Sequence, residues 1–304
     1  MNGKGHDDPT THDGKWHRIF DMMRDKKLDI LALNETHLDD VGVDRLREKF
    51  GKRLWIFNSP NPTTPTAKEG VALVLNKEMT NVNDVQCRVL IPGRAVILSV
   101  AWHAKLTLSY LAVYAPNDRR DNERFWDVLY TQILSDTSIP IPDAMGGDLN
   151  AVEDPLDALP MRREHAGVSR ALRRLVSTLQ MEDGWREHNK NKLGYTHRQL
   201  SSGTQSRIDR IYASKEIMNV SQNWEIEVPN FKTDHKLVTM EITSPNAPHI
   251  GRGRATWPKH LIAGDRVLNE AIKAKRSVPR NIKIYLMTIG GCITIYPIIT
   301  DQYL

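Results

Sequence analysis

Polar side chains that could carry acid–base or metal chemistry cluster at five separate places along this chain. Each cluster stands where a predicted apolar strand ends or begins. The five clusters are Asn34–His37, Tyr114–Asn117, Gly146–Asn150, Ser206–Asp209 and Thr233–His235. Strand ends that face one edge of a sheet sandwich converge, so a single site can be assembled from segments that are distant in the sequence.

The residue types in these clusters suit hydrolysis of a phosphodiester bond. A hard cation such as Mg²⁺ binds carboxylate and amide oxygens, and Glu35 and Asp209 can supply carboxylate oxygens. His235 can take a proton from water if a carboxylate such as Asp209 or Asp234 orients its ring. The clusters therefore contain both a potential metal site and a potential general base.

The remaining polar residues could contact the substrate. Asp148 and Asn150 alternate around Leu149, so both side chains point to one face of an extended segment. Asn150, Asn117 and Tyr114 are neutral donors that can contact a phosphate whose negative charge grows in the transition state.

Each cluster taken alone also has a purely structural interpretation. Gly, Asp and Asn all suit turns, so a Gly-Asp-x-Asn pattern is often only a turn. An Asp-His pair is usually part of a solvated surface, and Arg207 and Asp209 could form a surface ion pair. The ordered set of five clusters, rather than any one of them, indicates a function.

The elements that must position these clusters can be read from the hydrophobic pattern. Strands outnumber helices, and several strands follow one another with no helix between them. This favours an α/β sandwich with mixed or antiparallel sheets over a doubly wound parallel sheet. Short apolar runs predict strands over 28–33, 53–58, 70–76, 96–102, 106–114, 208–212 and 237–242, and amphipathic spacing predicts helices over 13–27, 121–134 and 168–179.

The 304-residue chain is long enough for one large domain, which we predict over residues 1–244. Residues 245–304 are predicted to be a basic linker, containing Gly251–Arg254, and a poorly defined tail. The formal net charge of +5 suits a nucleic-acid partner. The two cysteines, Cys87 and Cys292, are far apart and are expected to be reduced thiols. With no apolar leader or membrane span, we expect an intracellular monomer, nuclear or cytoplasmic, with no membrane partner.

In this order, the five clusters resemble the motifs of the apurinic/apyrimidinic endonuclease branch of the exonuclease–endonuclease–phosphatase (DNase I-like) superfamily, and most closely the endonucleases of non-LTR retrotransposons. Leu33–His37 resembles the family's L-Q-E-T, with Asn34 in place of Gln, and Tyr114–Asn117 resembles its Y-x-P-N. Gly147–Ala151, Ser206–Tyr212 and Thr233–His235 resemble its G-D-[FL]-N, S-x-R-I-D-x-I/Y and S-D-H motifs.

The resemblance implies a four-layer α/β sandwich, with two packed mixed or antiparallel sheets flanked by helices. It also implies DNA as the partner, Mg²⁺ or Mn²⁺ as the cofactor, and a nick that leaves a 3′-hydroxyl, as in retrotransposon target-site cleavage or abasic-site incision. The implied catalytic residues are His235, Asp209, Asp148 and Tyr114, the implied phosphate or substrate contacts are Asn117, Asn150 and Arg207, and the implied metal ligands are Glu35, Asp234 and Asn2.

The chain departs from the family pattern at both ends. Family domains begin with a core strand that reads x-x-x-x-N-x-x-G, whereas Met1-Asn2-Gly3 matches only the last three positions. We therefore expect the first strand to be missing, with Asn2 as a weak substitute at the metal site. No reverse transcriptase follows, and residues 263–304 do not resemble the family. A fragment of a retroelement would explain both departures.

Two other functions remain open from the sequence. A truncated domain could be catalytically dead and bind nucleic acid only through its basic surface. A relative could instead act on a phospholipid or inositol phosphate, although no lipid-directed amphipathic stretch is visible.

Overall fold

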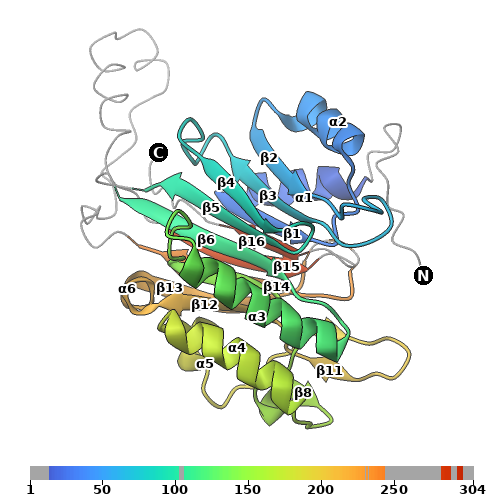
Figure 1. Ribbon diagram of the computed structural model, residues 1–304. Coiled ribbons are helices and arrows are strands. Elements are labelled where there is room, and N and C mark those ends of the chain that lie inside the picture. The colour runs from blue at the N-terminus through green and yellow to red at the C-terminus, as the bar shows by residue number, and fades with distance from the viewer. Residues whose placement is uncertain are drawn as a thin grey trace, which may run out of the picture.

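The computed structural model describes residues 14–102, 106–229, 231, 233–243, 282–288 and 293–296. Within these ranges six α-helices and several sheets form a mixed α/β architecture (Figure 1). The helices are α1 (Lys15–Asp25), α2 (Asp40–Phe50), α3 (Arg119–Ser135), α4 (Ala166–Thr178), α5 (Gly184–His188) and α6 (Lys215–Val220).

The strands of the described residues fall into four sheets. One sheet has the order β1 (Ile30–Asn34), β3 (Val71–Asn76), β2 (Leu54–Ser59). The largest sheet has the order β4 (Gln86–Ile91), β5 (Ala95–Ala101), β6 (Thr107–Tyr114), β7 (Ala144–Asp148), β12 (Asp209–Ser214), β9 (Met181–Asp183). A small sheet has the order β10 (His197–Arg198), β11 (Gln205–Ser206), β8 (Ala158–Leu159), and the fourth has the order β13 (Ser221–Glu227), β14 (Leu237–Ile242), β15 (Ile282–Thr288), β16 (Ile293–Tyr296).

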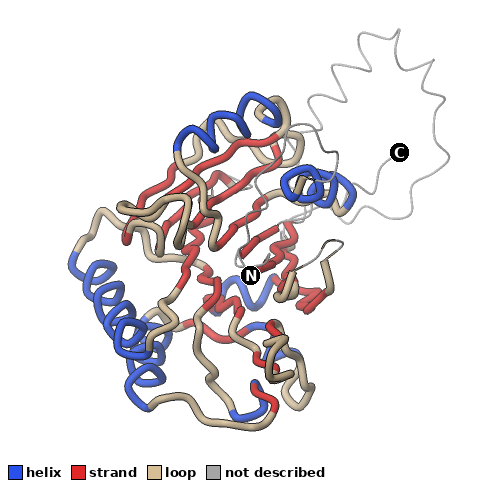
Figure 2. The backbone as a smooth tube through the Cα atoms, turned by 90° about the vertical axis from the view of Figure 1, so that its right-hand side faces the viewer, coloured by secondary structure: helices blue, strands red, loops and turns tan. Residues whose placement is uncertain are grey.

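Three hydrophobic cores separate successive layers of helices and sheets. One core lies between the largest sheet and helices α3 and α4. This core includes Trp126, Leu172 and Met145. A second joins the other face of that sheet to β1, β3 and β14, and a third packs α1 and α2 against β1–β3. In Figures 1 and 2, α3 and α4 lie side by side on the outside of the strands. The layers therefore follow one another in this order: helices α3 and α4, the largest sheet, the sheets that carry β1–β3 and β14, and helices α1 and α2.

Most of the predicted elements are confirmed. The three predicted helices correspond to α1, α3 and α4, and the predicted strand pair over 96–102 and 106–114 forms the antiparallel pair β5–β6. Helix α2 was not predicted, because Gly42 interrupts a short apolar stripe. Its start is nevertheless marked in the sequence, since the Asp39 side chain accepts the Gly42 backbone N–H at 2.7 Å as an N-cap.

Strand β7 contains the two glycines that made this segment resemble a turn. A Cβ atom at Gly146 would lie 2.5 Å from the Tyr110 hydroxyl, and one at Gly147 would overlap the carbonyl group of Val113. Both glycines are therefore needed for the close approach of β7 to its neighbours. The interpretation of Gly146–Asp148 as a simple turn is wrong.

The strand register aligns three of the sequence clusters in one row. Strands β6 and β7 are parallel and pair Tyr114 with Asp148, while β7 and β12 are antiparallel and pair Asp148 with Asp209. Because a parallel pair needs a crossover connection, α3 lies between β6 and β7 in the chain. Tyr114, Asp148 and Asp209 therefore lie side by side on three adjacent strands.

The C-terminal strands extend the sheet that carries β14. Strand β15 pairs antiparallel with β14, with Leu237 opposite Met287, and β16 pairs with β15 and contacts β1. The predicted boundary at residue 244 and the missing first strand both stay predictions. Asn2 and the basic segment Gly251–Arg254 lie outside the described residues.

Candidate active site

Asp148, Asp209 and His235 form the centre of the site. Their ligand atoms lie within 4.8 Å of one another, and all three side chains are buried. The His235 ring nitrogen Nδ1 lies 2.9 Å from Asp209 Oδ2, so Asp209 fixes the orientation of the imidazole. The structure thus brings together one residue from each of three separate sequence clusters.

The position of Asp209 is fixed by Thr196, a fully buried residue of the segment that leads into β10. The Thr196 hydroxyl accepts the backbone N–H groups of Ile208 and Asp209, both at 3.1 Å. The Thr196 carbonyl also accepts the Lys236 N–H at 2.6 Å, which ties this segment to the His235 loop. Thr196 was missed because it stands in a polar, Ser- and Gly-containing stretch that looks like an ordinary loop.

The electrostatics of this centre favour retention of protons. Burial raises the pKa of Asp148 well above its usual range, and the neighbouring Asp209 carboxylate raises it further. Burial alone would lower the pKa of His235, but the adjacent Asp209 carboxylate raises it to about 9. His235 is therefore cationic near neutral pH, whereas the ionised form of Asp148 is disfavoured.

Tyr114 and Glu35 form the other end of the site. The Tyr114 hydroxyl donates to Glu35 Oε1. Burial, followed by the Glu35 and Asp148 charges, raises the pKa of Tyr114, so the phenol stays protonated as a donor. The Arg94 guanidinium lies 4.6 Å from the centre of the Tyr114 ring and 2.5 Å from Glu69 Oε1. No motif in the sequence singled out Arg94, which stacks on Tyr114 and fixes its ring.

Glu35 reaches Tyr114 because β1 is tied to β6. The Asn34 side-chain amide donates to the Val113 carbonyl at 2.7 Å, directly before the chain turns at Glu35. Glu35 has a φ of 51°, and Asn150 has a φ of 46°. Left-handed backbone at non-glycine residues is costly and concentrates at functional sites. Two of the predicted site residues therefore occupy strained backbone positions.

Asn150 and Asn117 occupy different environments after strands β7 and β6. The Asn150 N–H donates to Asp148 Oδ1, and its side-chain amide donates to the Ala115 carbonyl, both at 2.9 Å. Asn150 therefore fixes the loop beside Asp148. Asn117 is exposed in the loop that leads into α3, so its side chain can be reached by a ligand.

Glu35 and Asp234, both implied as metal ligands by the resemblance, contact different parts of the site. Glu35 lies beside Tyr114, and its charge acts on Asp148. Asp234 is exposed, and its Oδ2 lies 3.9 Å from Nε2 of His197. Among the described residues, the potential metal-ligand atoms of Asp234 lie close to those of His197 and His235.

The structure does not support the phosphate-binding role expected of Arg207. This side chain is 1% exposed. Its Nε and Nη2 atoms lie 2.7 and 2.9 Å from the Asp157 carboxylate, and Nη2 lies 2.7 Å from Asp183 Oδ2. Burial and these two carboxylates keep the guanidinium away from a phosphate. The alternative of a surface ion pair with Asp209 is also wrong, because Asp209 is fully buried and bonds to His235.

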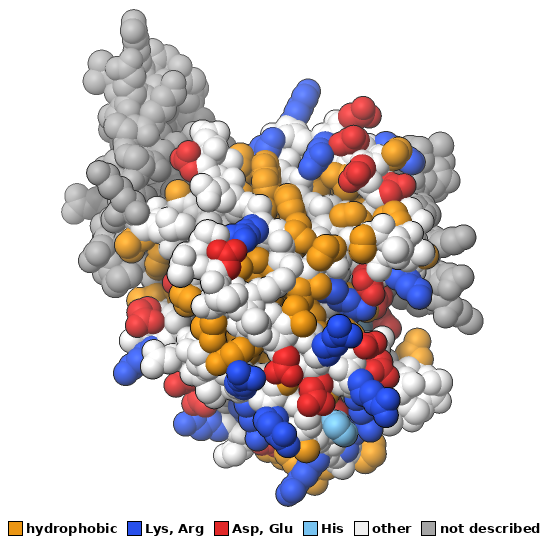
Figure 3. Space-filling model, viewed as in Figure 1, with side chains coloured by type: hydrophobic (Ala, Val, Ile, Leu, Met, Phe, Trp, Pro, Cys, Tyr) orange, Lys and Arg blue, Asp and Glu red, His pale blue; other side chains and the backbone are white. Residues whose placement is uncertain are grey.

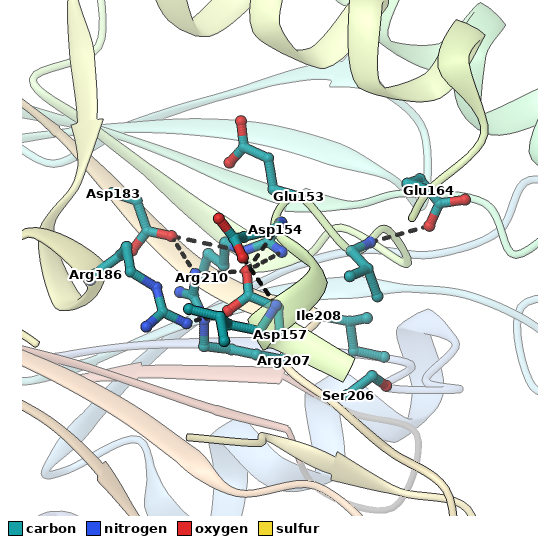
Figure 4. A network of polar contacts seen from close by, with 12 residues as sticks. Glu153, Asp154, Asp157, Glu164, Asp183, Arg186, Ser206, Arg207, Ile208 and Arg210 are labelled. Carbon is teal, nitrogen blue, oxygen red and sulfur yellow. Dashed lines mark hydrogen bonds and ion pairs between the residues drawn. The ribbon is translucent and has the colours of Figure 1, made fainter. Parts of the chain in front are cut away.

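Arg207 belongs to a buried ion network next to the site (Figure 4). The Asp157 carboxylate contacts the guanidinium groups of Arg186, Arg207 and Arg210. Burial would raise the pKa of Asp157, but these cations lower it below its usual range. We call Asp157, Asp183, Arg186, Arg207 and Arg210 the arginine network.

The donor set of the site fits a hard divalent cation. Asp148 and Asp209 bring two carboxylates together in a buried centre, and Glu35 adds a third at its partly exposed end. His235 is bonded to Asp209 in this centre, and its charge also acts on Asp148. Carboxylate oxygens are the ligands that Mg²⁺ and Mn²⁺ prefer.

The face that carries α3 and α4 has no such concentration of one charge. Figure 3 shows Lys and Arg side chains interspersed with Asp and Glu over these helices. This pattern is typical of an ordinary solvated surface. No helix of the described residues is long and apolar enough to cross a membrane.

Residues 10–235 match the Endonuclease/Exonuclease/phosphatase family, and the chain belongs to this family. It is 32% identical over 166 residues to the Transposon TX1 uncharacterized 149 kDa protein of Xenopus laevis. That match covers 52% of this chain but only 12% of the Xenopus protein, so the chain spans a small part of that relative.

Two solved structures have the same fold at low sequence identity. The AP endonuclease LMAP from Leishmania major is 14% identical, with a TM-score of 0.59 over 74% of this chain and 81% of that one. The endonuclease domain of TRAS1, a telomere-specific non-LTR retrotransposon, is 14% identical, with a TM-score of 0.52 over 72% of this chain and 88% of that one. The resemblance read from the sequence motifs is confirmed.

Proposed function

We propose that this protein is a divalent-metal-dependent endonuclease that nicks DNA and leaves a 3′-hydroxyl and a 5′-phosphate. The observation that carries the proposal is the row of Tyr114, Asp148 and Asp209 on adjacent strands, with His235 bonded to Asp209. Neighbouring strands lie about 4.8 Å apart, so this row spans about 10 Å. A phosphodiester fits between its two ends.

The Asp148–His235 end is the side from which water attacks. The cationic His235 pairs with a non-bridging phosphate oxygen, and Asp209 keeps its ring in place. Asp148 accepts the proton that the attacking water loses, and burial strengthens this carboxylate as a base. Asn150 holds the Asp148 carboxylate in position.

The Tyr114–Glu35 end receives the leaving group. Glu35 would hold the divalent cation, which as a Lewis acid stabilises negative charge on a phosphate oxygen. The Tyr114 hydroxyl donates a hydrogen bond to the departing 3′ oxygen as the P–O3′ bond breaks. That oxygen then takes a proton from solvent, so the net reaction is hydrolysis.

DNA is the substrate that the surroundings of the site favour. The small sheet of β8, β10 and β11 adjoins His235 through a backbone bridge from His197. Its loops expose Met161 (70%) and Leu200 (81%). Arginines 162, 163 and 198 are exposed beside them, an arrangement that suits contact with phosphates and base edges. The two similar solved structures are both described as endonucleases.

Relaxation of supercoiled plasmid tests this function. We expect open circles to form with Mg²⁺ and not with EDTA, and each nick to be extended directly by a DNA polymerase. Asp209→Asn should lower the nicking rate by about 10³-fold, because His235 loses its orienting carboxylate. Asp127→Asn, at an exposed position on α3, should keep the wild-type rate.

A folded wild-type protein that binds DNA in a salt-sensitive manner but never nicks it would contradict the proposal. That outcome would identify a domain that only binds nucleic acid.

A further inference from the structure

Beside the proposed catalytic residues lies a second group of possible metal ligands, formed by His197, Asp234 and His235. The ligand atoms of these three residues lie within 4.8 Å of one another. The two imidazole ring centres are 4.5 Å apart, and Asp234 Oδ2 is 3.9 Å from His197 Nε2. His197 was not among the residues singled out from the sequence.

The backbone holds this group together independently of the side chains. His197 and His235 form an antiparallel β-bridge. The Arg198 N–H donates to the Asp234 carbonyl at 3.2 Å, and the Lys236 N–H donates to the Thr196 carbonyl at 2.6 Å. Three residues from two segments are therefore fixed next to one another before any ligand binds.

The orientation of His235 leaves one nitrogen available. Its Nδ1 atom is bonded to Asp209, so Nε2 is the atom that can reach a ligand. A carboxylate bonded to the other ring nitrogen is the usual support of a zinc-bound histidine. His197 and Asp234 are partly open to solvent, with side chains 24% and 40% exposed, so an ion can enter.

The donor types separate this group from the magnesium-type site. Two imidazole nitrogens and one carboxylate oxygen, with a fourth position open to water, match a zinc site. Mg²⁺ prefers oxygen ligands only, which Glu35, Asp148 and Asp209 offer. The two sites are linked because His235 of the zinc-type group is bonded to Asp209 of the magnesium-type site, so an ion in one site affects binding in the other.

We propose that His197, Asp234 and His235 bind Zn²⁺ or a similar transition-metal ion, and that this ion inhibits the enzyme. The bound ion occupies Nε2 of His235, which can then no longer pair with the phosphate. Inhibition rests on the proposed nuclease function, whereas binding of the ion does not.

Zinc binding is measured first, without DNA, by competition of the metal-free full chain with a chromogenic zinc chelator. We expect one ion per chain, and His197→Gln should weaken the affinity by about 100-fold because one of three protein ligands is lost. The matched control is His165→Gln, which removes an exposed histidine at the start of α4 and should keep wild-type affinity. Circular dichroism checks that each variant is folded. No stoichiometric binding, or equal affinity of wild type and His197→Gln, would overturn the proposal.

Inhibition is measured second, as the zinc concentration that halves Mg²⁺-dependent nicking relative to the zinc-free rate of the same variant. We expect this concentration to rise at least about 10-fold in His197→Gln and to stay unchanged in His165→Gln. Zinc binding without nicking under any condition would support the site and refute the nuclease. Nicking without zinc binding would support the nuclease and refute the site.

Discussion

The arginine network and the catalytic cluster of Asp148, Asp209 and His235 are both buried, and both use β12, but their charges balance differently. In the network, the Asp157 carboxylate faces three guanidinium groups, and Asp183 faces two of them. In the catalytic cluster, two carboxylates share a single imidazole.

The pKa directions express the same contrast. The guanidinium groups lower the pKa of Asp157, whereas burial and Asp209 raise the pKa of Asp148. The Asp157 carboxylate is therefore stabilised in its charged form, whereas the charged form of Asp148 is disfavoured. The arginine network, in which the opposite charges are paired, thus contributes to the fold. The cluster of Asp148, Asp209 and His235, in which they are not evenly paired, is suited to binding a cation.

The two regions are also mechanically linked. Arg207 and Arg210 flank Asp209 in the sequence, and the Arg207 N–H donates to the Asp157 carbonyl at 2.8 Å. The Leu149 N–H donates to the Ile208 carbonyl at 2.9 Å. These backbone bonds hold the loop after β7 against the start of β12, where Asp148 and Asp209 are paired.

The largest expected effect comes from breaking the network. Asp157→Asn leaves the buried guanidinium groups of Arg207 and Arg210, and the partly buried one of Arg186, without their shared anion, which should lower the free energy of unfolding by about 3–5 kcal/mol. Urea unfolding measures this loss, with Asp127→Asn as the surface control. A change below about 1 kcal/mol would mean that the network is not the stabilising region.

Between pH 6 and 10, the free energy of unfolding should change because of the cluster, through His235, and not because of the arginine network. The folded-state pKa of His235 is raised to about 9, above the value near 6.5 of an unfolded histidine. The stability from its protonated form is complete below about pH 6.5 and is lost as the pH rises through about 9, a loss on the order of 3 kcal/mol. Urea unfolding in EDTA from pH 6 to 10 measures it, and an equal slope in His235→Gln would contradict the assignment.

Added cation should stabilise the protein through the cluster. At ten times its dissociation constant, Mg²⁺ should raise the free energy of unfolding by about 1.4 kcal/mol. Glu35→Gln should need a higher Mg²⁺ concentration for the same gain, because one carboxylate ligand is lost. An undiminished response in Glu35→Gln would place the ion elsewhere, and Asp127→Asn is again the control.

The smallest effect gives the sharpest contrast, since its sign is opposite to that of Asp157→Asn. Without metal, Asp148→Asn should raise the free energy of unfolding by about 1 kcal/mol, because it removes a carboxylate whose ionisation burial disfavours. The amide can still accept the Asn150 N–H. Destabilisation in this variant would show that the cluster is balanced after all.

The sequence was sufficient for the elements with a clear period and for the residues at strand ends. The amphipathic spacing of α1, α3 and α4 and the position of His235 beside Asp209 were foreseen from side-chain order and motif resemblance. The glycines of β7 concealed a strand, since their role depends on the distance to Val113 and Tyr110, which no local pattern contains.

The role of Arg207 could not be predicted for a similar reason. A charged side chain is expected at the surface unless its partners are known. The partners of Arg207 are Asp157 and Asp183, which lie in other segments and have no signature of their own. His197 was missed because its neighbour His235 is brought close only by tertiary pairing.

The pairing of β15 with β14 has a consequence for synthesis on the ribosome. Domains fold as the chain emerges from its N-terminus, and contacts between distant segments form last. Strand β1 is translated first, whereas β15 and β16, which lie between it and β14, are translated after β14. His235 likewise follows every other member of its cluster. The cluster of Asp148, Asp209 and His235 is therefore complete only after His235, its last member in the chain, has been translated and has paired with Asp209.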